Sequence, residues 1–97
     1  MEHLFKYGED DLAIIVENGL GITNSTLDNK EGLRAAIIGL ITVAGLGEKL
    51  KCESVNPYNS GLRFTIEPKE VISQIMFLEL LREFQKSLKR WETESDY

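Results

Sequence analysis

The last third of the chain most constrains the fold, because it is apolar on two opposite sides of one helix. Placing successive residues about 100° apart puts Val71, Ile75 and Leu78 on one side. The stripe on the far side is longer and consists of Phe77, Leu80, Leu81, Phe84, Leu88 and Trp91. A helix that packs on its own sheet needs only one apolar stripe. The second stripe therefore needs a second partner, inside the chain or outside it.

Two interpretations of the second stripe stay open. Either one side packs on the sheet and the other on the first helix, or one side forms a seam with a second copy of the chain. A helix of roughly 24 residues spans about 36 Å, whereas a strand of about 6 residues spans about 20 Å. We therefore expect the last two turns to overhang the core and to be covered by another molecule. The expected interface residues are Phe84, Leu88, Trp91, Val71, Ile75 and Leu78.

Length and charge limit the class of protein. The 97 residues fit a single domain, 1–97, in which we expect the polar residues 92–97 to form a disordered tail. The net charge of −5 opposes non-specific binding to nucleic acid, so we do not expect nucleic acid as a partner. The opening residues lack the pattern of a signal peptide, and the longest apolar stretch, 33–46, is too short to span a bilayer. We expect a cytoplasmic protein without membrane contact.

The first quarter of the chain predicts strands. Residues 12–17 form a continuous β-branched run that ends in Asn18-Gly19, a pair that suits a type I′ turn, and residues 20–24 follow. This pattern predicts a hairpin whose first strand is buried on both faces. Residues 3–7 predict an additional edge strand, joined to the hairpin through a polar turn at 8–11.

A helix is predicted next. Asp28 has the character of an N-cap, and Glu31 three residues later suits a capping box. Apolar residues then recur at helical spacing, namely Leu33, Ala36, Ile37, Leu40, Ile41 and Ala44. Gly45 and Gly47 are expected to end this helix.

The second half of the chain repeats this order. Residues 50–55 and 62–67 predict a hairpin, and the second strand alternates cleanly between apolar and polar side chains. Pro68 stands where we expect the last helix to begin. The predicted fold is α+β: a two-layer sandwich with a mostly antiparallel four-stranded sheet in the order ββαββα and two helices on one face.

No residue pattern indicates catalysis or a cofactor. Cys52 is the only cysteine and is expected to be a buried structural residue, and a zinc site is not expected with one His and one Cys. The acidic run 9–11 suits a solvated turn, and the glycines at 19–21 and 45–47 match neither phosphate-loop nor dinucleotide patterns. We expect no enzyme, no metal, no cofactor and no small-molecule ligand.

The only basic concentration lies near the end of the last helix and consists of Arg82, Lys86, Lys89 and Arg90. A solvated helix face is the simpler interpretation, and contact with RNA or an acidic protein is the alternative. The neighbouring aromatic residues Phe84 and Trp91 fall on the opposite side of the helix, which disfavours a surface for stacking bases.

The expected element order resembles that of the small dimerising subunit of the archaeal KEOPS tRNA-modifying complex, which pairs a short antiparallel sheet with two helices. The resemblance is one of size and topology, because the Ser/Arg-rich opening and the Asn-Ser core of that subunit's last helix are not matched in residues 68–84. It implies an accessory subunit of an RNA or tRNA complex as the alternative function. The leading expectation is a non-catalytic interaction or assembly module, as a homodimer or as a small subunit of a larger complex.

Overall fold

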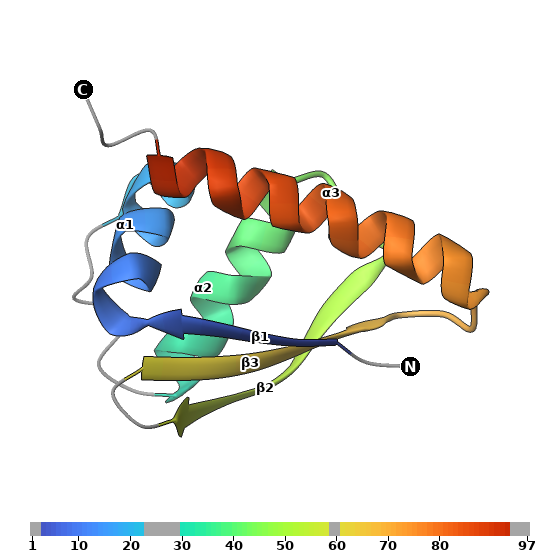
Figure 1. Cartoon of the computed structure of the whole chain (residues 1–97), viewed down its shortest axis with the longest axis horizontal. Coiled ribbons are helices and arrows are strands. Elements are labelled where there is room, and N and C mark those ends of the chain that lie inside the picture. Colours follow the sequence, from blue (N-terminus) through green and yellow to red (C-terminus); the bar gives the residue numbers. More distant parts are fainter. Residues whose placement is uncertain (1–2, 23–29, 59–60, 94–97) are drawn as a thin grey trace.

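The computed structural model describes residues 3–22, 30–58 and 61–93, and it shows three helices on one face of a three-stranded antiparallel sheet (Figure 1). The elements in chain order are β1 (His3–Gly8), α1 (Glu9–Leu20), α2 (Lys30–Val43), β2 (Leu50–Tyr58), β3 (Gly61–Pro68) and α3 (Gln74–Thr93). The strands lie in the order β1-β3-β2. No helix in the described part is both long and apolar enough to cross a bilayer.

The predicted α+β class is confirmed, but the detailed topology differs from the prediction. The described elements follow the order βααββα, with three strands and three helices in place of four strands and two helices. The topological resemblance to the KEOPS subunit rested on the order ββαββα, so the structure removes that basis.

The largest difference lies at residues 9–20, where a helix replaces the predicted polar turn and buried strand. A continuous apolar run does not by itself distinguish a buried strand from a buried helix. Leu12, Ile15 and Val16 are almost completely buried, and their spacing of three and four residues defines one face of a helix. Asp10 and Asp11 stand in the first turn, where negative charge interacts favourably with the helix dipole.

The pair Asn18-Gly19, predicted to form a hairpin turn, lies inside α1. A Cβ atom on Gly19 would lie 2.6 Å from Leu40 Cδ2 and 2.9 Å from Trp91 Cδ2. This glycine therefore allows α2 and α3 to approach α1 closely. The helix ends at Gly21, whose φ of 69° is left-handed and whose N–H donates to Glu17 O at 2.8 Å.

Strand β1 confirms the predicted edge strand. Among the described strands it pairs only with β3, and it places Phe5 opposite Phe64. The two rings stack with their centroids 5.2 Å apart, so β1 joins the sheet through the core as well as through backbone hydrogen bonds.

Helix α2 also confirms its prediction. The predicted apolar positions are buried, apart from the half-buried Ala44, which lies just past the helix end. The helix stops in a Schellman arrangement: Leu46 N–H donates to Ile41 O and Gly45 N–H to Thr42 O, both at 3.0 Å, while Gly45 adopts a φ of 80°. The predicted cap Asp28 lies outside the described residues.

The predicted hairpin of β2 and β3 is confirmed, although β2 extends three residues beyond the predicted end at residue 55. Leu62, Phe64 and Ile66 are buried on one face of β3, as their alternation indicates. A bulge between Cys52 and Ser54 lets β2 place both Cys52 and Val55 on this buried face. The opposite face of the sheet carries polar pairs such as Lys51 with Glu67.

Helix α3 begins later than predicted. Pro68 ends β3, where it pairs with Leu50, and the helix starts only at Gln74. Ser73 is the N-cap, because its Oγ accepts a hydrogen bond of 3.2 Å from Met76 N–H. Residues 92 and 93 belong to the helix rather than to the expected tail, and the rest of that tail lies outside the described residues.

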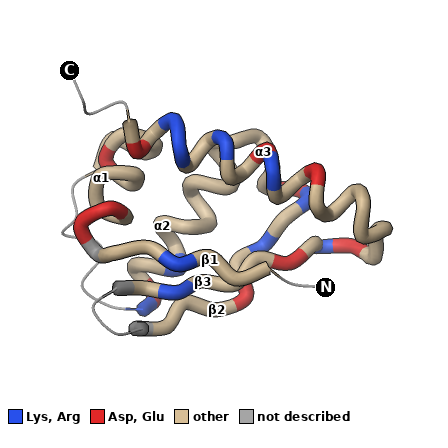
Figure 2. Tube along the Cα trace, in the orientation of Figure 1, with Lys and Arg blue, Asp and Glu red and all other residues tan. Residues whose placement is uncertain are grey.

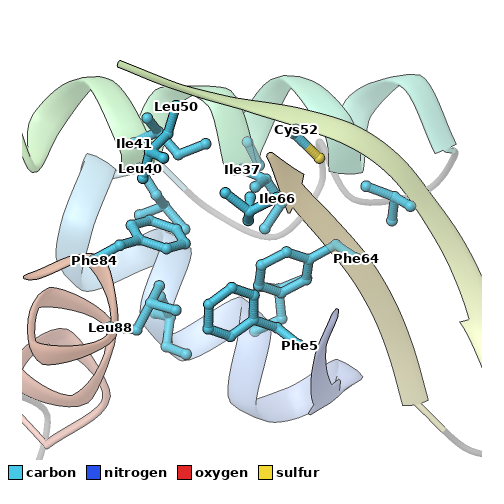
Figure 3. Close-up of a cluster of buried hydrophobic side chains, with 14 of the residues drawn as sticks. Phe5, Ile37, Leu40, Ile41, Leu50, Cys52, Phe64, Ile66, Phe84 and Leu88 are labelled. Atoms are coloured by element: carbon cyan, nitrogen blue, oxygen red, sulfur yellow. The ribbon is translucent and has the colours of Figure 1, made fainter. Parts of the chain in front are cut away.

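All three helices and the sheet contribute to one core (Figure 3). Phe5 joins two other rings in it, with Phe64 stacked on one side and Phe84 packed edge-on at 5.7 Å. Leu40 and Leu88 approach the same region from α2 and α3. The helix layer is therefore held by apolar burial, the dominant stabilising term in folding.

Candidate interaction surface

The first half of α3 and the loop before it carry an exposed apolar surface, which we call the α3 patch. Its residues and their exposed fractions are Val71 104%, Ile75 71%, Met76 54% and Leu78 48%. Single exposed apolar residues are ordinary, but neighbouring ones on one surface usually mark an interaction site. Figure 1 shows why they are uncovered: the start of α3 extends beyond α1 and α2, above the end of β3.

The sequence determines this exposure through the helical period. Phe77 and Leu81 face the core, whereas Ile75 and Leu78 lie on the other side of the helix. The loop 69–73 connects β3 to the helix and leaves Val71 fully exposed. Val71, Ile75 and Leu78, the expected side, are thus all exposed in the single chain.

The other three expected interface residues are core residues of the single chain. Phe84 and Leu88 are fully buried, and Trp91 is 4% exposed. Asn18 Nδ2 donates a hydrogen bond to Trp91 O, which joins α1 to the end of α3. The expected overhang of the last two turns is therefore wrong: α1, which was predicted to be a strand, covers them. The helix does project past its neighbours, but at its beginning.

A hollow of about 420 Å³ adjoins the α3 patch and lies between α3 and the turn that precedes β2. Its lining consists of Ile72, Met76, Leu80, Glu48, Glu70, Glu79 and Lys49. The apolar members belong to α3 and the loop before it, and the charged members comprise three carboxylates and one ammonium group. This side of the α3 patch is therefore apolar with an acidic border. Met76 belongs to both the patch and the hollow, and no pattern in the sequence indicated the hollow.

The second half of α3 has the opposite charge on its outer side. Arg82, Lys86, Lys89 and Arg90 are all exposed, as the solvated-face interpretation expects. Figure 2 shows the positions of Lys and Arg residues along this half of α3. Glu83 lies among them and pairs with Lys86 at 3.8 Å. The aromatic residues of this half, Phe84 and Trp91, are buried in the core, so within α3 no ring accompanies the cations on the outer side.

Cys52 is 1% exposed, and its thiol lies 3.7 Å from Ser54 O. Burial raises the pKa of this thiol to about 11, with the Arg34 charge acting in the opposite direction. The thiolate is the reactive form of cysteine. The raised pKa therefore favours the protonated, unreactive thiol at neutral pH. The structural role of Cys52 stays a prediction.

One carboxyl pair lies on the open face of the sheet. Hydrogen bonding to Glu67 raises the pKa of the Glu53 carboxyl, and the same contact together with Lys51 lowers that of Glu67. Lys51 Nζ lies 3.3 Å from Glu67 and 3.9 Å from Glu53. These groups stand on a solvated surface outside the hollow. Within the described ranges, no three His, Cys, Asp or Glu side chains converge where they could hold a metal ion.

Comparison with known proteins yields no matching family model, no matching curated protein and no matching solved structure.

Proposed function

We propose that this chain is a non-catalytic assembly module that associates with a second copy through the α3 patch. The observation that carries the proposal is the exposure of four large apolar side chains on the projecting start of α3 and the loop before it. Burying apolar surface is the main driving force of protein association, at roughly 25 cal/mol per Å² of surface removed from water. Two-fold dimers are the commonest oligomers.

Sedimentation of the purified chain at several concentrations tests this function. We expect the parent to self-associate and Leu78→Asp to weaken the association at least tenfold, because the dimer would have to bury an unpaired carboxylate. Val43→Asp is the matched control, since Val43 is 54% exposed at the end of α2 and lies outside the patch. A parent that stays monomeric, or a Leu78→Asp variant that associates like the parent, would overturn the proposal.

The rival function is an accessory RNA-binding subunit that uses the exposed cations of α3. Arg82, Lys86 and Lys89 support it, and the net charge of −5 and the buried rings of Phe84 and Trp91 oppose it. A filter-binding titration against tRNA over a salt series separates the two functions. Affinity that falls steeply with salt would favour the rival.

A further inference from the structure

The outer side of α3 carries two unlike halves on one ridge. Ile75, Arg82 and Lys86 are all exposed, and separations of seven and eleven residues return to nearly the same side of a helix. The ridge therefore begins apolar and continues basic. The acidic border of the patch lies at the apolar end, with Glu70 just before the helix and Glu79 in its second turn.

We propose that two copies pair through antiparallel α3 helices around a two-fold axis near Leu78, so that the basic half of each helix covers the apolar and acidic half of the other. This inference rests on the proposed function and adds the pairing mode. A two-fold contact brings the same surface of both copies together, so the surface must be complementary to itself. One end of this ridge is apolar with an acidic border, and the other end is basic. The basic end of one copy can face the acidic end of the other only when the two helices run in opposite directions.

The spacing along the chain gives the register of the pairing. Leu78 meets its own counterpart at the axis. Lys86 lies eight positions after Leu78 and Glu70 eight positions before it. Because the helix begins only at Gln74, Glu70 belongs to the loop 69–73, and the two-fold operation brings the partner's Lys86 one turn past Gln74, toward this loop. Glu70 is exposed and is therefore accessible to the partner.

The same register also covers the apolar patch. Arg82 lies four positions after Leu78, so in the partner it comes level with the helix start beside Ile75. The methylene stems of Arg and Lys pack on apolar surface while their charged ends stay in water. The partner's Arg82 and Lys86 stems would therefore lie over Ile75 and Val71. Such a contact has an apolar centre and a charged rim, as specific interfaces generally do.

Charge reversal tests the pairing mode directly. Glu70→Lys and Lys86→Glu each turn two symmetry-related attractions into repulsions, so each variant alone should dimerise on the order of tenfold more weakly than the parent. In an equimolar mixture, each heterodimer contains one copy of each variant. At one end the new lysine at position 70 meets the new glutamate at position 86, so the charges are again opposite. At the other end the parental Glu70 and Lys86 meet. The mixture should therefore regain near-parental affinity, measured by sedimentation with one variant fluorescently labelled.

The control pair is Glu17→Lys with Lys30→Glu. Both parental side chains are exposed, on α1 and at the start of α2, at the far end of the molecule from the start of α3 (Figure 1). These variants change the net charge by the same amounts as the test pair but lie outside the proposed contact. Each should therefore self-associate nearly as the parent does, and mixing the two should not raise the affinity.

The outcomes separate this inference from the proposed function. Weak single variants with a restored mixture support antiparallel pairing. Self-association that Leu78→Asp abolishes, but that neither charge reversal changes beyond the controls, would overturn the pairing mode and leave the proposed function standing. A parent that remains monomeric at every concentration would overturn both.

Discussion

At the scale of single residues, Tyr7 shows how a side chain at the edge of the core responds to its surroundings. It is half-buried at the end of β1, and its ring stacks on Phe64 with centroids 5.7 Å apart. Burial raises the pKa of the Tyr7 hydroxyl to about 12, and the Glu92 and Asp11 carboxylates add to the effect. All three influences disfavour the phenolate.

This shift predicts a pH dependence of stability. Between about pH 10 and pH 12, an unfolded Tyr7 has lost its proton while the folded one keeps it. The unfolded state binds fewer protons in that window, so the free energy of unfolding should fall as pH rises, whereas below pH 10 the stabilisation is fully present. Urea unfolding of the parent and Tyr7→Phe from pH 9 to pH 11.5 checks this. The variant should lose less stability over the range, and parallel curves for the two proteins would refute the assignment.

At the scale of elements, the predictions succeeded where the sequence shows the period of an element and failed where an uninterrupted apolar run hides it. The hairpin β2–β3 and the helix α2 show their periods in the sequence, because polar and apolar residues alternate or recur on them. Residues 12–16 are apolar without interruption, so their period is hidden, and burial against two other helices decides for a helix over the β preference of Ile and Val. The late start of α3 could have been predicted, because Ser73 is a better cap than Pro68.

For the candidate site, the sequence predicted the correct side of α3 but the wrong end of it. The helical period separated Val71, Ile75 and Leu78 from the opposite stripe correctly. Which end of α3 would be covered depended on α1, an element that the sequence did not indicate. Once that segment is a helix, it packs on the end of α3 and leaves the beginning uncovered, which moves the candidate interface from one end of the helix to the other.

The close approach of the three helices predicts opposite effects for two glycines. Gly19→Ala should lower the free energy of unfolding by about 1–2 kcal/mol, because the new methyl group would clash with the packed ring of Trp91 and with Leu40. Gly39→Ala meets only the flexible end of Leu20, at 3.1 Å, so the gain in helix propensity of up to about 1 kcal/mol should dominate. Chemical unfolding of both variants measures the difference. Equal effects would show that α1 does not pack this closely.

At the scale of the whole molecule, the two stripes of α3 have separate roles: one closes the core and the other faces outward. Phe77, Leu81, Phe84, Leu88 and Trp91 are the buried residues of α3. This division makes the stability of the chain depend on one side of the helix and its self-association on the other. The substitutions Leu88→Asp and Leu78→Asp place the same charge on the two sides and so separate these roles.

Leu88→Asp should abolish folding. It removes a fully buried leucine, which costs about 2–5 kcal/mol, and adds an unpaired carboxylate to the core. A domain of this size has roughly 5–15 kcal/mol of stability in total. Leu78 is 48% exposed, so Leu78→Asp should change the free energy of unfolding of the monomer by only about 0.5 kcal/mol. Circular dichroism and urea unfolding at protein concentrations too low for association measure both effects without a contribution from the dimer. If Leu88→Asp folds with nearly parental stability, the last turns of α3 do not close the core, and the expected overhang at that end of the helix would regain support.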